Sequence, residues 1–138
     1  MRAVRIQRKR VARYSMHAQS RATNGLPCKS VARPGPFGNP FKWQELSFSP
    51  GEPGGSRGVA VRKFREWFYS PEGEAMRAAA SAELKGHNLA CYCPLYQHGI
   101  GYTPCHADVL LAFLNEIPEE EVIRENIRRS KREESERK

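Results

Sequence analysis

The sequence predicts a small α/β domain in which a short central sheet is flanked by helices in layers. Short apolar runs typical of buried strands occur together with longer segments of helical periodicity, which is the pattern of an α/β fold. The chain has 138 residues, a length that suits one domain with a single hydrophobic core. We therefore expect one domain over residues 1–117, followed by a charged helix or tail over residues 118–138.

The N-terminal part of the chain is expected to contribute two strands. Residues 4–11 begin with apolar side chains that alternate with polar ones, and residues 28–33 have the composition of a second short strand. Residues 12–27 are polar and are expected to be irregular. Three prolines and two glycines in residues 34–41 forbid regular structure. Residues 49–58 are rich in glycine, proline and serine and are expected to form a second loop.

Helical patterns occupy the middle of the chain. Apolar residues recur at helical spacing over residues 60–68, with charged residues on the other side. A second helix is expected to begin at Ser70 and Pro71, because serine caps helix N-termini and proline suits the first turn. It extends to Leu84, and Gly86 fits the position just past its end.

A strand and an apolar helix follow each other in the last third of the chain. Residues 88–93 are short and apolar, as a buried strand should be, and residues 95–102 are expected to form a loop. Residues 103–116 begin with threonine and proline and are apolar nearly all round, which predicts a central helix. Together they predict a Rossmann-like βα unit, in which ligands gather beyond the carboxyl end of the strand. Alternating charges from Glu119 onward predict a solvated helix whose last eight residues fray.

Positive charge is concentrated at the N-terminus. The whole chain carries a formal charge of +8. Residues 1–44 hold ten lysines and arginines and no acidic residue, whereas residues 45–118 hold six basic and eight acidic side chains. This asymmetry predicts that the N-terminal third contacts phosphate, with a nucleotide or a nucleic acid as the partner. A solubilising arm that contacts nothing specific is an equally good explanation.

Composition also gives an expectation for the cellular location of the protein. No apolar run approaches the roughly 20 residues that cross a bilayer, so we expect neither a transmembrane helix nor a membrane partner. The basic N-terminus lacks the apolar segment of a secretory signal. We expect a cytoplasmic protein whose four cysteines are thiols or ligands rather than disulfides.

Three cysteines and a histidine are expected to meet at the βα unit. Cys91 and Cys93 point to the same face of an extended strand, and Cys105 and His106 lie at the start of the next helix. Three thiols and an imidazole suit tetrahedral zinc, so Cys91, Cys93, Cys105 and His106 are candidate metal ligands. Consecutive helical residues diverge by about 100°, however, which argues against Cys105 and His106 binding one ion.

A catalytic pocket without a metal is the second interpretation of these residues. A helix N-terminus lowers the pKa of a thiol, so Cys105 is a candidate nucleophile. His106 would then act as acid or base, and Asp108 would orient it or contact a sugar hydroxyl. In the third interpretation Cys91 and Cys93 are small buried hydrophobic residues with no further role. The sequence leaves these alternatives open, as it does the question of enzymatic activity.

The segment rich in glycine and proline provides candidate ligand-binding residues. Arg33 stands before it and would either clamp a phosphate or be an ordinary surface arginine. Asn39 would either contact the ligand or hold the loop by side-chain bonds. Gly38 and Phe41 complete this candidate set. Trp43 is expected to belong to the core, and stacking on a base is the alternative.

Four short motifs stand in order along the chain: Val31-Ala-Arg-Pro, Gly38-Asn-Pro-Phe, Leu84-Lys-Gly-His-Asn-Leu-Ala-Cys-Tyr-Cys-Pro-Leu and Cys105-His-Ala-Asp-Val-Leu-Leu. With them the chain resembles, over about residues 4–116, the domain of unknown function 4326, a family common in bacteriophages and also found in bacteria. Phe37 and Tyr92 stand where that family often has tryptophan, and the loop after Cys93 is long. The resemblance implies a compact α/β fold and an intracellular, phage-encoded protein, and it implies no established activity.

Three functional hypotheses follow from the sequence. The favoured one is a domain that binds or processes a nucleotide or nucleic acid at the Cys/His cluster. The second is a non-catalytic, zinc-stabilised module whose basic N-terminal third binds DNA or RNA. The third is a phage protein that binds a host protein through its charged tail.

Overall fold

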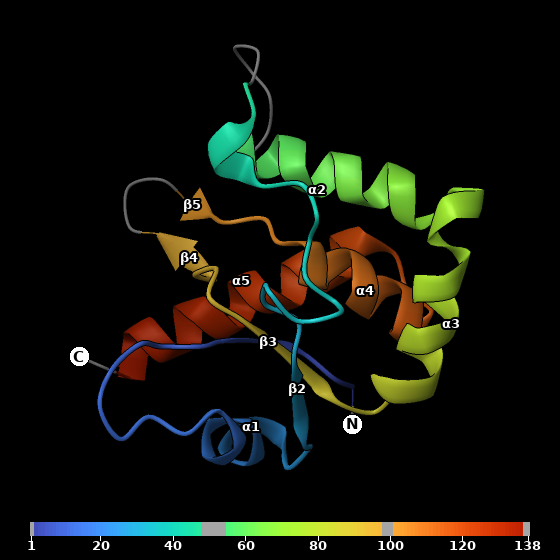
Figure 1. Cartoon of the computed structure of the whole chain (residues 1–138). Helices are drawn as coiled ribbons and strands as arrows, with labels where there is room; N and C mark the ends of the chain where they lie inside the picture. Colours follow the sequence, from blue (N-terminus) through green and yellow to red (C-terminus); the bar gives the residue numbers. More distant parts are fainter. Residues whose placement is uncertain (1, 48–54, 98–100, 137–138) are drawn as a thin grey trace.

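The computed structural model describes residues 2–47, 55–97 and 101–136 and has the mixed α/β architecture that the sequence predicts (Figure 1). The elements in chain order are β1 (Arg5–Gln7), α1 (Met16–Asn24), β2 (Cys28–Ser30), the 3-10 helix η1 (Trp43–Glu45), α2 (Gly55–Phe68), the 3-10 helix η2 (Pro71–Gly73), α3 (Glu74–Glu83), β3 (Asn88–Cys91), β4 (Tyr96–Gln97), β5 (Gly101–Tyr102), α4 (His106–Asn115) and α5 (Glu119–Glu136).

The central sheet has three parallel strands, with β3 between β1 and β2. All four residues of β3 are buried, as expected for the middle strand of a parallel sheet that is covered on both faces. Figure 1 shows α1 on one side of the sheet and α2, α3 and α4 on the other. Because the strands are parallel, their carboxyl ends lie at one edge. The short strands β4 and β5 form a separate antiparallel hairpin.

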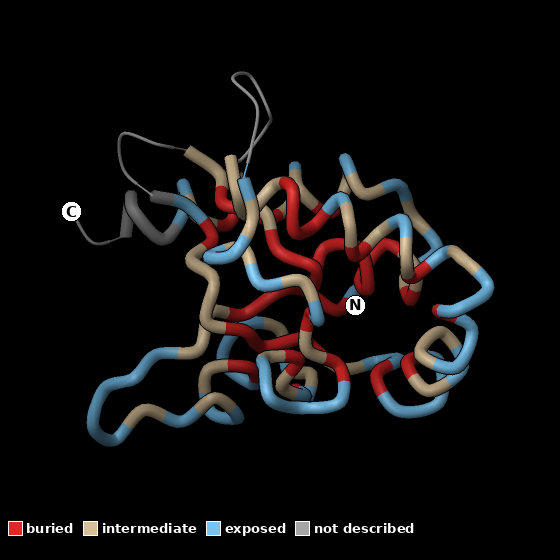
Figure 2. Tube along the Cα trace, turned by 45° about the horizontal axis from the view of Figure 1, so that its top comes forward, coloured by how far each residue is buried: buried red, intermediate tan, exposed pale blue. Residues whose placement is uncertain are grey.

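Helix α4 lies at the centre of the hydrophobic core, as its apolar sequence predicts. Its first seven residues are all buried, and it packs against β1, β3, α2 and α5. Figure 2 shows the buried chain concentrated along this helix and the sheet, with exposed segments around it. The start of α4 is therefore held rigidly next to the carboxyl end of β3.

Helix α1 corrects the expectation that residues 12–27 are irregular. The Ser15 hydroxyl oxygen accepts a hydrogen bond from the Ala18 backbone N–H at 3.1 Å and so caps the helix. Gly25 ends it with a φ of +80°, a left-handed conformation that favours glycine. Only Ser20 of this helix is buried, so the sequence carries almost no apolar periodicity to reveal it.

Other element boundaries also differ from the prediction. Helix α2 begins at Gly55, inside the segment expected to be a loop, and residues 48–54 of that segment lie outside the described residues. The Ser70 hydroxyl donates to the Trp67 carbonyl and does not cap the following helix. The three strands of the sheet are shorter than expected, and β3 ends at Cys91 rather than at Cys93. The expected loop over 95–102 contains β4 and β5, and residues 98–100 lie outside the described residues.

Helix α5 packs along α4 and contributes to the core. Val122, Asn126 and Arg129 are buried, so one face of this charged helix is in contact with the rest of the domain. The helix continues through Glu136, beyond the point at which fraying is expected, and residues 137–138 lie outside the described residues. Within the described residues, no helix is both long and apolar enough to cross a membrane.

Candidate functional site

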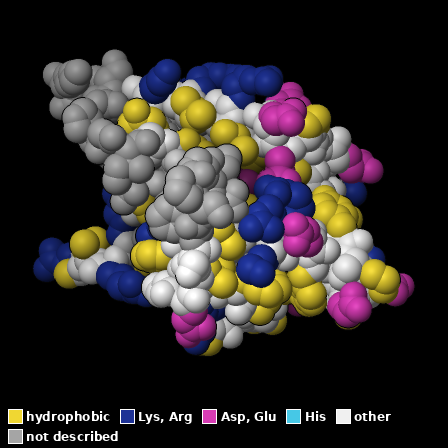
Figure 3. Space-filling view, turned by 90° about the horizontal axis from the view of Figure 1, so that it is seen from above, with side chains coloured by type: hydrophobic (Ala, Val, Ile, Leu, Met, Phe, Trp, Pro, Cys, Tyr) yellow, Lys and Arg dark blue, Asp and Glu magenta, His cyan; other side chains and the backbone are white. Residues whose placement is uncertain are grey.

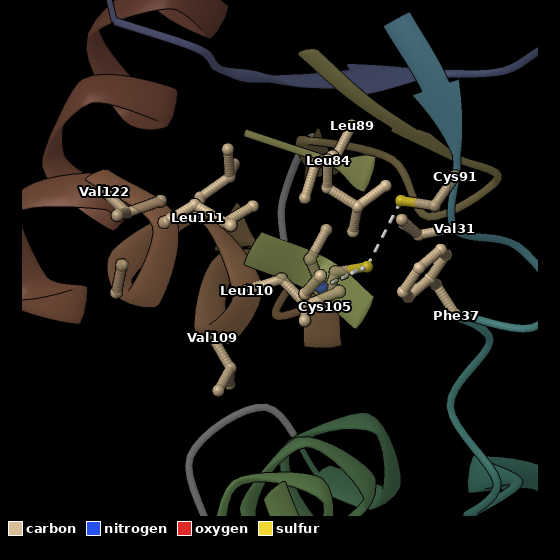
Figure 4. Close-up of a cluster of buried hydrophobic side chains, with 14 of the residues drawn as sticks. Val31, Phe37, Leu84, Leu89, Cys91, Cys105, Val109, Leu110, Leu111 and Val122 are labelled. Carbon is tan, nitrogen blue, oxygen red and sulfur yellow. Dashed lines mark hydrogen bonds between the residues drawn. The ribbon is translucent and has the colours of Figure 1, made fainter. Parts of the chain in front are cut away.

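Three cysteines lie together at the carboxyl edge of the sheet. The Sγ atoms of Cys91, Cys93 and Cys105 are all within 4.8 Å of one another, and those of Cys91 and Cys105 are 3.2 Å apart (Figure 4). Cys91 is the last residue of β3, Cys93 follows it by two residues, and Cys105 immediately precedes α4. Cys91 and Cys105 are buried and Cys93 is half-buried. These three thiols are therefore close enough to bind one metal ion.

Cys105 is the N-cap residue of α4 and is not part of its first turn. Its backbone is extended, with φ −148° and ψ 147°, and its Sγ accepts the Ala107 backbone N–H at 3.5 Å. The Asp108 carboxylate in turn accepts the Cys105 backbone N–H at 3.3 Å, which completes a capping box. The 100° divergence expected between helical residues does not apply to an extended residue. His106 Nδ1 consequently lies 3.7 Å from Cys105 Sγ.

The three sulfur atoms differ in electrostatic character. Hydrogen bonds from the Cys91 and Cys93 thiols, together with the nearby charge of Arg5, hold the pKa of Cys105 well below its usual range. The same hydrogen bonds to Cys105 raise the pKa of Cys91 and of Cys93. Cys105 is thus the cysteine of the group whose thiolate form is most favoured.

The His106 ring is buried and has a defined orientation. Its Nε2 atom lies 3.0 Å from the Val31 carbonyl oxygen and 2.9 Å from the Phe37 carbonyl oxygen. Because both neighbours are acceptors, Nε2 carries the hydrogen and Nδ1 carries the lone pair. Burial lowers the pKa of His106, which favours this neutral form. Phe64 contacts the ring edge-on at a centroid distance of 5.2 Å.

A fully buried arginine lies behind the sulfur atoms. Arg5 donates through Nη1 to Asp108 at 3.1 Å and through Nη2 to the carbonyl oxygens of Thr103 at 2.9 Å and Pro94 at 3.2 Å. Its Nε is a buried nitrogen without a hydrogen-bond partner among the described residues. Burial opposes the charge of Arg5, yet the neighbouring Asp108 carboxylate raises the pKa of the guanidinium. A positive charge is therefore held permanently next to the cysteines.

Asp108 stabilises the polar core rather than orienting His106. Its carboxylate is bound by Arg5, by the Tyr102 hydroxyl, by Asn126 Nδ2 at 3.0 Å and by the Cys105 backbone. A third-position carboxylate in a helix reaches back toward the N-cap, which directs it away from the His106 ring. The expected contact between Asp108 and His106 is not among the hydrogen bonds of the described residues.

A cleft of about 530 Å³ opens onto the sulfur cluster. Its walls combine positive charge, aromatic rings and the cluster itself. The arginines are Arg10, Arg33 and Arg57, the aromatic residues are Phe41, Trp43 and Tyr92, and the cluster contributes Cys91, Cys93, Cys105 and His106. The rest of the lining is Ala32, Asn39, Gln44, Ala60, Val61 and Pro104.

Two arginines of the cleft lie over aromatic rings. The Arg57 guanidinium is 4.5 Å from the centre of the Trp43 ring, and the Arg10 guanidinium is 3.9 Å from that of Tyr92. Arg8 also lies over Tyr92, at 4.8 Å. These cation–π contacts restrain flexible side chains at the mouth of the cleft.

Comparison with known protein families gives one match, over residues 5–116, which is most of the 138-residue chain. The chain belongs to the family described as domain of unknown function, DUF4326. No curated protein and no solved structure matches the chain. The DUF4326 match includes every residue of the sulfur cluster and of the cleft and ends before α5. That description names no activity.

The ligand-binding candidates of this DUF4326 domain divide into two groups. Arg33 and Phe41 line the cleft. Asn39 also borders it, but its side chain is engaged internally: Nδ2 donates to the Ala60 carbonyl at 3.2 Å, and Oδ1 accepts the Phe41 backbone N–H at 2.9 Å. A Cβ added at Gly38 would lie 2.7 Å from Arg33 Cγ, so Gly38 permits the close approach of Arg33. Asn39 and Gly38 thus shape the loop that presents Arg33 and Phe41.

Arg5, Arg10 and Arg57 are residues of the DUF4326 site that sequence reasoning missed. Arg5 alternates with apolar neighbours and looks like an exposed strand residue, and Arg57 stands in a segment with the composition of a loop. Arg10 is separated from the cysteines by about 80 residues of sequence, so only the pairing of β1 with β3 brings it to the cleft. The absence of acidic residues before Glu45 was the one signal that pointed toward Arg5 and Arg10, and no signal pointed toward Arg57.

Proposed function

We propose that this domain binds a nucleotide unit, either free or within a single-stranded nucleic acid, in the cleft beside the sulfur cluster. The observation that carries the proposal is the convergence of three arginines and three aromatic residues on one cleft from four separate segments of the chain. The volume of about 530 Å³ lies within the range of small-molecule sites.

Each part of the cleft matches a part of such a ligand. Guanidinium groups bind phosphate oxygens through paired, charge-assisted hydrogen bonds, which suits Arg10, Arg33 and Arg57. Base stacking on an aromatic ring contributes about 1–3 kcal/mol and requires an unpaired base. Trp43 and Tyr92 are half-buried and border the cleft, and a base would stack on a ring face from which the arginine now over it has moved to the phosphate.

Titration of the protein with the four ribonucleoside monophosphates and with inorganic phosphate tests this function. We expect calorimetric binding of at least one nucleotide, stronger than that of phosphate alone. Replacing Arg33→Gln or Arg57→Gln should weaken binding at least tenfold, because each removes a cationic partner of the phosphate. Arg124→Gln on the exposed side of α5 makes the same charge change away from the cleft and should leave affinity unchanged. Absence of nucleotide binding, or equal losses in all three variants, would contradict the proposal.

The sulfur cluster favours a second candidate, a domain stabilised by a metal ion. We propose zinc as that ion, because three closely spaced thiols are soft ligands that prefer zinc to magnesium or calcium. Metal analysis of the purified protein should find about one zinc per chain, lost after Cys91→Ser and retained after Cys28→Ser. Cys28 is equally buried but lies outside the three-sulfur group, so it is a matched control.

A further inference from the structure

The zinc proposal leaves the fourth ligand open, and the geometry around His106 identifies it. We infer that His106 completes a closed Cys₃His site through Nδ1. In the closed site all four ligands come from the protein, so Cys105 is a ligand and not a nucleophile. This inference rests on the proposed metal centre and is independent of nucleotide binding.

The hydrogen bonds of the His106 ring leave only one of its nitrogens available. Nε2 lies between the carbonyl oxygens of Val31 and Phe37, at 3.0 and 2.9 Å, and neither can donate a hydrogen. The ring therefore donates through Nε2, and the unshared electron pair is on Nδ1. Donation of the second ring N–H to a backbone carbonyl is the usual arrangement of a histidine that binds a metal.

The distance between Cys105 and His106 suits two ligands of one ion, and the remaining distances require small shifts. Tetrahedral zinc, with Zn–S near 2.3 Å and Zn–N near 2.0 Å, places a sulfur and a nitrogen ligand about 3.5 Å apart and two sulfurs about 3.8 Å apart. His106 Nδ1 is 3.7 Å from Cys105 Sγ, but it does not lie within 4.8 Å of all three sulfur atoms, so the ring and the other cysteines must approach each other when the ion binds. Cys91 Sγ is 3.2 Å from Cys105 Sγ, so a shift of about 0.6 Å reaches the value for zinc. Cys93 is the least buried of the three and has the most room to adjust.

The backbone conformation at Cys105 allows two consecutive residues, Cys105 and His106, to bind the same ion. Cys105 is extended and His106 is the first residue of α4, so their side chains do not follow helical divergence. Figure 4 shows the Cys105 sulfur directed toward Cys91, with Val31 and Phe37 on the same side of the cluster. Those are the residues whose carbonyl groups accept the His106 hydrogen bond.

The surrounding charge suits the resulting centre. Zinc with three thiolates and a neutral imidazole has a net charge of −1. Arg5 is fully buried and acts electrostatically on both Cys91 and Cys105. Its positive charge offsets the negative charge of the centre, which reduces the cost of burying it.

A closed site would also stabilise one wall of the cleft. The His106 ring bridges the cluster and the backbone at Val31 and Phe37, and the segment between them carries Arg33. Zinc binding should therefore slow amide hydrogen exchange in residues 31–41 by at least tenfold, because the ring can no longer move away from those carbonyl groups.

X-ray absorption of the zinc-loaded, full-length protein tests the ligand set without any substitution. We expect three sulfur scatterers and one nitrogen scatterer with the outer-shell signature of imidazole. A shell with three sulfurs and an oxygen, or one without imidazole scattering, would overturn the assignment of His106 while leaving zinc binding by the cysteines in place. A protein that takes up no zinc would overturn both.

The Zn²⁺ affinity of substituted proteins provides the second test, and a second Cys–His contact in the chain provides the control. His106→Gln should weaken Zn²⁺ affinity by more than about 100-fold in competition with a chelator, which exceeds the effect of losing an outer-shell contact. His17 lies 3.6 Å from Cys28 Sγ and so forms a similar Cys–His contact elsewhere in the chain. His17→Gln should not change Zn²⁺ affinity. Equal affinities for wild-type and His106→Gln proteins, with both folded by circular dichroism, would refute the inference. Loss of nucleotide binding alone would not affect it.

Discussion

Asp108 joins four elements of the fold through one carboxylate. It pairs with Arg5 of β1, accepts from Tyr102 of β5 and from Asn126 of α5, and caps the start of α4. Both members of the Arg5–Asp108 ion pair are almost completely buried. Such a pair contributes little net stability compared with an apolar pair, but removal of one member leaves an uncompensated charge in the core.

The variant Asp108→Asn tests this consequence. Asparagine retains the size of the side chain but not its charge, so Arg5 is left buried and unpaired. We expect the free energy of unfolding to fall by about 3–5 kcal/mol in urea titrations. The control is Glu125→Gln, which breaks the more exposed pair with Arg128 and should cost less than about 1 kcal/mol. Similar losses in the two variants would show that the buried pair has no special importance.

Glycine determines the corner between α2 and α3. Gly73 has a φ of −88°, which any residue can adopt, so its role is not conformational. A Cβ at this position would lie 2.3 Å from the Phe68 carbonyl oxygen and 2.5 Å from that of Trp67. These are backbone atoms of α2, and they cannot move without displacing the helix.

Gly73→Ala should therefore destabilise the domain. In the absence of a clash, alanine would stabilise this position through its lower unfolded-state entropy. Here the overlap with α2 should instead cost about 1–3 kcal/mol, the range for overpacking. Thermal unfolding followed by circular dichroism measures the change. Ala78→Gly in the exposed part of α3 is the control and should cost about 1 kcal/mol through helix propensity alone. A stabilised Gly73→Ala protein would contradict this account.

Helix α5 lies outside the matched family segment but reaches the site through Asn126. The Asn126 amide donates to Asp108 at 3.0 Å and to the Tyr102 hydroxyl at 3.2 Å, and its oxygen accepts from Arg129 at 3.3 Å. Arg129 also donates to the Arg5 carbonyl at 2.7 Å. The charged C-terminal helix therefore closes the polar network that supports the cysteines.

Asn126→Ala should lower the free energy of unfolding by about 1–3 kcal/mol, because buried polar groups of the network lose their partners. Arg124→Ala, on the exposed side of the same helix, should remain within about 0.5 kcal/mol of the wild-type value. Urea titrations of the two variants at the same protein concentration give the comparison. Indistinguishable midpoints would mean that α5 is only loosely attached.

Elements with a strong apolar pattern were predictable from the sequence, and those stabilised by polar contacts were not. The composition of β3 and α4 reveals them, because both are buried nearly all round. Helix α1 depends on Ser15 and Gly25 at its ends and has no apolar stripe. A polar segment without an apolar stripe has the composition of a loop. The expectation that residues 12–27 are irregular was therefore wrong.

The same reasoning applies to the site. Cys91, Cys93 and Cys105 were expected to lie together because they belong to one strand and the start of the next helix. Residues this close in sequence can be placed from the βα pattern alone. Arg10 and Arg57 reach the cleft only through the sheet order and the packing of α2. Sequence patterns do not specify such long-range geometry, so a basic N-terminal third was predictable and its position against the cluster was not.

At the scale of the whole molecule, the parallel pairing of the strands brings the basic side chains and the cysteines to the same edge of the sheet. The chain leaves β1 toward Arg8 and Arg10, leaves β2 toward Arg33, and ends β3 at Cys91, all at the same edge of the sheet. Figure 3 shows lysine and arginine side chains at the left margin, on the side where the loop after β1 projects in Figure 1. Phosphates that extend beyond the cleft would meet this basic loop.

If the cleft binds a nucleic acid strand as proposed, the salt dependence of binding measures how many of these charges contact it. For single strands, the logarithm of the affinity falls with the logarithm of salt concentration by about 0.7 for each phosphate that a cation neutralises. With a fluorescent single-stranded octanucleotide, Arg10→Gln should weaken binding and reduce that slope by about 0.7, since Arg10 links the basic loop to the cleft. Arg124→Gln changes the net charge equally and should leave the slope unaltered. An affinity independent of salt, or equal slope changes in both variants, would mean that the basic N-terminal third does not lie along the strand.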